Sequence, residues 1–321
     1  MYNISYKSVF VFFIKLLIVG GAFYFITSKI VKDPIFTNSS FFLSVKTAFL
    51  KNPLPLFIIL LFSALNWFLE VVKWKVLVSS IQKISFVESL KQSLSALTTA
   101  LFTPNKIGEY GAKAMYYDKK ERKKVLLLTF LGNFSQLFVT IIFGILGFLF
   151  FSNELPFNTN YFSFPIIISF FFLIGIFLVV RNNTKNTYLK QFFTSLKSIS
   201  STIHLKNLLY SVLKYLVFSH QFYFIMVFLE INLGYLTTMP ILFSMYFIAS
   251  IIPSFVIFDW LIKGSVAVAL FSVFEVNEIT IVFVTSSMWL LNFALPAIIG
   301  SYFVLTFDSK KILLKEKSIA L

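Results

Sequence analysis

The chain has 321 residues, of which 58% are hydrophobic and only 13% are charged. A soluble domain of this length would need far more polar side chains on its surface, so the composition indicates an integral membrane protein without a recognisable soluble catalytic domain. The net charge of +15 would suggest nucleic acid in a soluble protein, but here the basic residues lie mostly between apolar runs, which indicates membrane topology and anionic headgroups. With no cysteine, the chain has no disulfide, thiol catalysis or cysteine metal site.

Apolar runs long enough to cross a bilayer recur along the chain, since a spanning helix needs about 20 such residues. Lys15 and Lys214 each interrupt such a run, and we expect both to snorkel toward an interface. Residues 38–51 and 185–206 mix lysines with apolar residues and are typical of segments along the headgroup layer. The predicted spans are 9–27 (an uncleaved first span), 52–69, 125–153, 155–180, 207–229 and 279–307, and prolines divide a further apolar run, 231–258.

These elements predict an all-α, polytopic membrane bundle of about six to eight spans, two of its hairpins being re-entrant and broken by proline. We expect one transmembrane domain over 1–321, with pseudo-repeat halves around 53–150 and 207–306. The expected location is the cell membrane.

Basic residues predict the orientation of the bundle. They are concentrated in 106–124, in 181–206 and after Phe307, so these segments are expected in the cytoplasm. The segment 152–160 has Glu154 and no cation, which predicts the opposite side, and the acidic segments around Glu230 and Glu275 follow it there. The lysines of 29–51 fit this orientation less well.

A short apolar helix ends at Pro104, after about 14 residues, too few for an ordinary span. Gly108 and Gly111 would allow close backbone approach there. If a helix restarts after the proline, Glu109 and Lys113 stand at i and i+4 on one face.

The same pattern occurs late in the chain, where Pro253 ends a short helix and Asp259 and Lys263 follow at i and i+4. Interrupted helices in corresponding halves are typical of a transporter site. Lysines and helix N-termini facing a wet cavity would attract a phosphate, so the four charges are expected in one cavity near the bilayer midplane. Alternatively, each pair only satisfies itself and stabilises its turn.

A third cluster lies at residues 66–74. Asn66, Glu70 and Lys73 share one helical face, and Trp67 and Trp74 are one heptad apart, which also suits simple interfacial anchoring.

Isolated polar residues in later runs have ordinary interpretations. Asn133 and Gln136 fit helix–helix hydrogen bonds better than ligand contacts. His204 and His220 lack partners in sequence and are expected to be ordinary interfacial or bundle residues.

The segment around Pro104 resembles the flippase-like transmembrane region associated with lysylphosphatidylglycerol synthases. That family carries a P-x-x-x-G-E-x-x-x-R/K core, which Pro104, Gly108, Glu109 and Lys113 match. The segment 73–75, Lys-Trp-Lys, is similar to a basic tryptophan segment in an early helix of the family.

The family's second hallmark is matched only in part. Pro253-Ser254 and Lys263 match it, but 255–260 replaces a glycine-rich turn and Gly264 stands where Glu is usual. Because the chain ends shortly after its last apolar run, the soluble aminoacyl-transferase domain of longer members is expected to be absent. The resemblance then implies membrane-lipid translocation without lysine transfer.

The leading hypothesis is a lipid flippase-like transporter and not an enzyme. The alternatives are a membrane enzyme acting on a lipid-linked substrate and a non-transporting scaffold of the cell envelope. Expected partners are phosphate-bearing membrane lipids, such as phosphatidylglycerol derivatives or polyprenyl-phosphate sugars, with no nucleic acid, cofactor, metal or catalytic residue. The predicted substrate-binding residues are Pro104, Lys106, Gly108, Glu109, Lys113, Asp259 and Lys263, supported by Asn66, Glu70, Lys73, Asn133 and Gln136.

Overall fold

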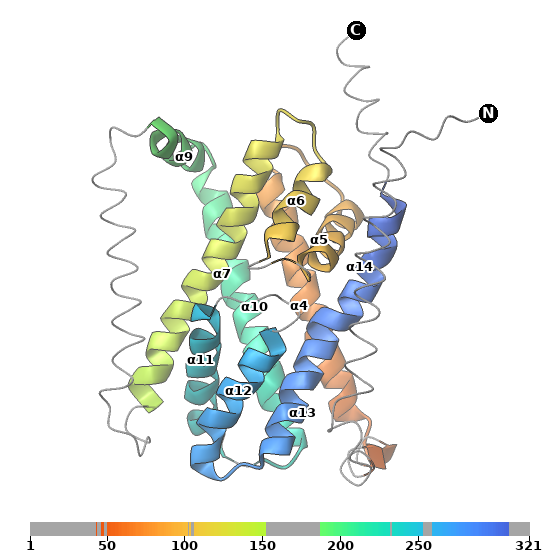
Figure 1. Ribbon diagram of the computed structural model, residues 1–321, viewed down its shortest axis with the longest axis vertical. Helices are drawn as coiled ribbons and strands as arrows, with labels where there is room; N and C mark the ends of the chain where they lie inside the picture. The colour runs from red at the N-terminus through yellow and green to blue at the C-terminus, as the bar shows by residue number, and fades with distance from the viewer. Residues whose placement is uncertain are drawn as a thin grey trace, which may run out of the picture.

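The computed structural model describes most of the chain between residues 51 and 307, and every regular element in this part is helical (Figure 1). The predicted spans 9–27 and 155–180 lie outside the described residues, as do Pro104 and Pro253. The described residues are 43, 46, 47, 50–101, 103, 106–151, 187–231, 233–252 and 259–307.

The first half of the described chain consists of two long helices separated by two short ones. A capping box starts the first short helix, because the Ser85 side chain accepts from the Glu88 amide and the Glu88 carboxylate accepts from the Ser85 amide. The four helices are α4 (Leu54–Val78), α5 (Phe86–Ala100), α6 (Ile107–Met115) and α7 (Arg122–Phe151).

The second half repeats this order after a separate short helix, α9 (Thr187–Lys197). The last long helix is one continuous run that contains a π-helical turn. The elements are α10 (Ser201–Phe228), α11 (Tyr235–Ile251), α12 (Asp259–Phe271) with a 3₁₀ turn η3 (Ser272–Phe274), α13 (Glu278–Trp289), the π-helical η4 (Leu290–Ala294) and α14 (Leu295–Thr306).

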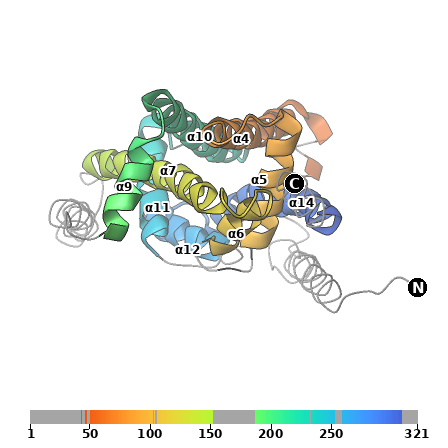
Figure 2. The same ribbon diagram turned by 90° about the horizontal axis from the view of Figure 1, so that it is seen from above.

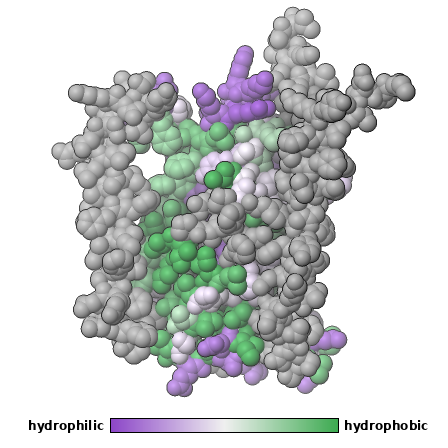
Figure 3. Space-filling view, in the orientation of Figure 1, coloured by the Kyte–Doolittle hydropathy of each residue, from purple (hydrophilic) through white to green (hydrophobic). Residues whose placement is uncertain are grey.

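Within the described part of the chain, four helices are long and apolar enough to cross a membrane, which suggests a multi-pass membrane protein. In Figure 3, hydrophilic residues gather at the two ends of the visible face and hydrophobic ones between them, as expected for a bilayer-spanning bundle. The four are Leu54–Val78, Arg122–Phe150, Ser201–Phe228 and Glu278–Thr306.

Two sequence predictions about helix ends were wrong. We placed the end of the first described span at Leu69, but α4 continues through Glu70 and Lys73 to Val78, because these charges are paired inside the bundle. We also placed all of 185–206 along the headgroup layer. The structure instead starts α10 at Ser201, and this helix continues without a break through the spanning run to Phe228.

The two halves interlock and run in opposite directions. The helix pair α5–α6 enters from one end of the bundle and the pair α11–α12 from the other, and both pairs stop near the middle (Figure 1). Corresponding contacts occur in both halves: α4 packs on α10, α5 packs on α14, and α11 packs on α7. Figure 2 shows α4 and α10 together along one side of the bundle. The pseudo-repeat halves around 53–150 and 207–306 stay a prediction.

The ends of the helices agree with the relative topology that the charges predicted. Tyr116, in the loop before α7, packs against Phe307 at the end of α14, with ring centroids 4.7 Å apart. α9 lies at the same end, whereas the turns before α11 and α13 lie at the opposite end (Figure 1).

Candidate functional site

A cavity of about 440 Å³ lies in the centre of the described bundle. Side chains from α4, α5, α6, α7, α10, α11, α12 and η4 line it, so both halves of the chain contribute. Nine of the predicted site residues line this cavity: Asn66, Glu70, Lys73, Lys106, Glu109, Asn133, Gln136, Asp259 and Lys263.

 Gly108 is not part of the lining and instead packs closely against Thr99 of α5.

The pair on α6 is closed and buried. The Lys113 ammonium lies 2.7 Å from Oε1 of Glu109, and the two side chains are 4% and 11% exposed. Asn133 of α7 donates to the other carboxylate oxygen at 3.3 Å, and the ammonium lies 4.2 Å from the ring centroid of Trp74. Lys113 does not line the central cavity. It lies in a small adjoining cavity with Glu70 and Lys73, so it acts on the site through Glu109.

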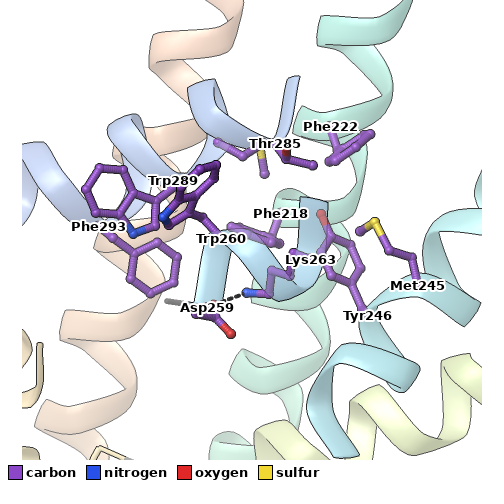
Figure 4. A pocket seen from close by; sticks show the side chains of 11 residues that line it. Phe218, Phe222, Met245, Tyr246, Asp259, Trp260, Lys263, Thr285, Trp289 and Phe293 are labelled. Atoms are coloured by element: carbon purple, nitrogen blue, oxygen red, sulfur yellow. Dashed lines mark hydrogen bonds and ion pairs between the residues drawn. The ribbon is translucent and has the colours of Figure 1, made fainter. Parts of the chain in front are cut away.

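The pair on α12 is more open and lies among aromatic rings. The Lys263 ammonium is 2.6 Å from Oδ2 of Asp259, with side chains 22% and 25% exposed. Its distances to the ring centroids of Phe218 and Phe293 are 5.6 and 5.4 Å. Figure 4 shows this pair with the rings of Phe218, Phe293 and Tyr246 around it. The surrounding rings give this end of the cavity an aromatic wall.

Between the two pairs, Glu70 carries two lysines on one carboxylate oxygen. Lys214 of α10 lies 2.5 Å from its Oε2, and Lys73, one turn along α4, lies 3.2 Å from the same atom. Our prediction that Lys214 snorkels to an interface was therefore wrong. Lys214 lies halfway along α10, too far from either end for its stem to reach water. That central position is the signal that sequence reasoning overlooked.

A neutral hydrogen-bond network continues from this charged cluster. Asn66 donates to Oδ1 of Asn292 at 2.9 Å, and Asn292 donates to Oε1 of Gln221 at the same distance. Gln221 in turn donates to the Ser63 hydroxyl at 2.6 Å. The network joins α4, α10 and η4 beside the cavity. Asn292 and Gln221 were not among the predicted residues, because a lone amide in an apolar run does not reveal its partner.

The turn that starts α6 depends on close packing against α5. The Gly108 amide donates to the Thr103 hydroxyl at 2.8 Å, and a Cβ at Gly108 would collide with the Thr99 carbonyl. The close approach predicted at Gly108 is confirmed. The one predicted at Gly111 is wrong, because a Cβ there would meet no atom within 4 Å. Gly111 instead faces outward.

Two further interpretations are now decided. Trp74 is only 1% exposed and donates to Gln92 at 2.7 Å, so it is a core residue and not an interfacial anchor. Asn133 and Gln136 do form helix–helix hydrogen bonds, to Glu109 and to the Ser211 carbonyl. Both side chains also line the cavity.

The charge of the cavity favours an anion. Its lining includes four lysines and three carboxylates among the described residues. Lys106 is exposed and, within the part of the chain that the structure describes, has no carboxylate within ion-pair distance. Its backbone is left-handed, with φ of 60°, which ends the turn and starts α6. Lys106 therefore contributes to the cavity lining a positive charge that no carboxylate of the described residues pairs with.

The histidines have local partners. His204 contacts the Leu196 carbonyl at 3.1 Å, and His220 contacts the Tyr235 hydroxyl at 2.9 Å. Within the described residues, no three histidine, aspartate or glutamate side chains are grouped so that they could hold a metal ion.

Comparisons of the chain with family models, with curated proteins and with solved structures found no match. The resemblance to the flippase-like family therefore stays a prediction.

Proposed function

We propose that this chain is a lipid transporter of the flippase type, which passes an anionic head group through the central cavity while the lipid tails stay in the bilayer. The observation that carries the proposal is the meeting of Glu109 with Asp259 and Lys263 in one cavity, although they come from opposite halves of the chain. A charge facing lipid at the centre of a spanning helix costs about 2.5–3.5 kcal/mol. Several charges gathered in one cavity therefore indicate that the cavity binds or conducts a charged group.

The two short helix pairs give the path its shape. α5 ends at Ala100 and α6 starts at Ile107, whereas α11 ends at Ile251 and α12 starts at Asp259. As re-entrant hairpins entering from opposite sides, they would leave a polar gap between them, with irregular backbone facing protein or water and not lipid. In this proposal, movement of each hairpin opens the cavity to the side of the membrane from which that hairpin enters.

The lysines give the path its selectivity. Lys106 lies at the N-terminus of α6, where the helix dipole also favours an anion. Lys73 and Lys214 share a single carboxylate, so their positive charge is only partly neutralised. A phosphate passing between them would complete the charge balance of the cavity.

A leaflet assay with purified protein in proteoliposomes tests the proposal. Fluorescent phosphatidylglycerol should exchange between leaflets faster than in protein-free vesicles, and faster than phosphatidylcholine, whose head group is zwitterionic. Lys106→Ala should slow the anionic lipid about tenfold, the effect of losing one charge-assisted contact. Lys123→Ala is the matched control, since Lys123 is exposed on α7 and does not line the cavity. Equal exchange with and without the protein for every anionic lipid tested would contradict the proposal.

A further inference from the structure

The central cavity has two chemically different ends. Toward α4 and α6 the lining carries most of the charged residues, together with the single rings of Trp67 and Tyr110. Toward α12, the rings of α10, α11 and η4 surround the Asp259–Lys263 pair. At the aromatic end the ring centroids of Tyr246 and Phe218 are 5.3 Å apart, and those of Tyr246 and Tyr215 are 6.1 Å apart. Phe293 lies across from them, on the other side of the Lys263 ammonium (Figure 4). A simple phosphate-binding site would not need this aromatic wall.

Two tyrosine hydroxyls at the aromatic end have no hydrogen-bond partner among the described residues. They belong to Tyr215 and Tyr246, whose residues are 5% and 6% exposed. Each oxygen is almost fully enclosed, so a ligand in the cavity would reach it only after a small movement of the ring. Because a buried hydroxyl without a partner is unfavourable, such a contact would stabilise a bound ligand. The Asp259 carboxylate, which also lines this end, keeps one oxygen, Oδ1, outside its ion pair with Lys263.

Rings, hydroxyls and a carboxylate around one space match the chemistry of a sugar. The apolar C–H face of a hexose packs on aromatic rings, and its hydroxyls bond to carboxylates and phenols. We infer that the transported head group is a phosphate-linked hexose, an inference that rests on the proposed function. Its phosphate would lie at the lysine end, near Lys106 and Lys214, and its sugar ring at the aromatic end, beside the Asp259–Lys263 pair.

The size of the cavity agrees with this inference. At about 440 Å³ it falls within the range of roughly 300–1,000 Å³ that is usual for small-molecule sites. A glycerol phosphate group could fill the lysine end, but it has no ring to cover the aromatic wall. It would also leave the two tyrosine hydroxyls without partners.

The experiment measures binding by calorimetry to the purified full-length chain in nanodiscs. Glucose 1-phosphate should bind at least about tenfold more tightly than glycerol 3-phosphate or inorganic phosphate. Glycerol 3-phosphate has no ring to pack on the aromatic wall, and inorganic phosphate has neither a ring nor sugar hydroxyls. Phe293→Leu and Tyr246→Phe should reduce this preference and leave the affinity for inorganic phosphate unchanged. Tyr302→Phe is the control, because Tyr302 is 64% exposed on α14 and does not line the cavity.

Unchanged phosphate affinity also shows that the variants are folded. Equal binding of glucose 1-phosphate and glycerol 3-phosphate by the unaltered protein would overturn the inference. If phosphatidylglycerol still exchanged between leaflets in that case, the proposed function would stand without it. A competition experiment then separates the two possible sources of the ligand. If polyprenyl-phosphoryl glucose in the nanodisc displaces bound glucose 1-phosphate, the site binds a lipid-linked sugar. If it does not displace glucose 1-phosphate, the site binds a free sugar phosphate and the lipid-linked assignment is overturned.

Discussion

The Lys214 ammonium lies 2.5 Å from the Glu70 carboxylate, and this ion pair joins α10 to α4. The two helices occupy the same place in the two halves of the chain, so the pair ties the halves together beside the central cavity. Because Lys73 contacts the same carboxylate oxygen, removing Glu70 leaves two lysines without their acid, whereas removing Lys214 leaves the carboxylate with one partner.

Glu70→Gln should therefore destabilise the protein more than Lys214→Met. A double-mutant cycle should give a coupling energy of about 1–3 kcal/mol, below the largest values for fully buried pairs because both side chains keep some exposure. Denaturant unfolding of the single and double variants in micelles measures this coupling energy. Lys75→Met, at an exposed position on the same helix, should change stability by no more than about 0.5 kcal/mol. A coupling energy near zero would show that the contact does not join the halves.

Gly108→Ala and Gly111→Ala should have effects of opposite sign. An alanine Cβ at position 108 would collide with the Thr99 carbonyl, and we expect a loss of about 1–3 kcal/mol. At position 111 a Cβ meets nothing, so the better helix propensity of alanine should give a gain of about 0.5–1 kcal/mol. Thermal unfolding of the two variants measures these changes in stability. Equal changes for the two variants would contradict the close packing of α6 against α5.

Asn292→Leu should cost about 1–3 kcal/mol, because it leaves the Asn66 amide and the Gln221 carbonyl without their partner. The double variant Asn66→Leu, Asn292→Leu removes both ends of one hydrogen bond, so it should be more stable than the sum of the two single variants predicts. Strict additivity in unfolding experiments would mean that the two amides do not interact.

The loops at the two ends of the bundle should be reached from opposite sides of the membrane. Because the chain has no native cysteine, Lys120→Cys, before α7, and Glu275→Cys, before α13, can each be labelled alone. A membrane-impermeant maleimide should label Glu275→Cys in intact cells and Lys120→Cys only after permeabilisation, as the basic residues around Lys120 predict. Labelling of both cysteines from the same side would contradict the placement of these two loops at opposite ends of the bundle.

The short helix pairs could be anticipated because their signals are local. A proline after too short an apolar run, and an acid followed by lysine at i+4, are visible in a window of about twenty residues. The structure closes both pairs, at 2.7 Å for Glu109–Lys113 and 2.6 Å for Asp259–Lys263.

The partners that connect distant helices could not be anticipated in this way. Glu70 and Lys214 are 144 residues apart, and Asn66 and Asn292 are 226 apart. Sequence shows that a buried charge or amide needs a partner, but only the packing of α4 on α10 and η4 selects it. Trp74 was misread for the same reason, since a tryptophan near a helix end suits an interface as well as a core.

The claim that the head group passes through the central cavity is tested most directly by blocking that cavity. Ser250 lines it from α11, is exposed to it and is small, so Ser250→Cys should fold and transport normally before modification. The matched control is Ile299→Cys, which is 56% exposed on α14 and outside the cavity lining.

The measurement is the rate of anionic lipid exchange between leaflets before and after each variant reacts with a bulky maleimide. The account predicts that modification reduces exchange by Ser250→Cys to the protein-free rate and leaves exchange by Ile299→Cys unchanged. Full exchange by completely modified Ser250→Cys protein would contradict the account, because the lipid head group would then have to cross by another route.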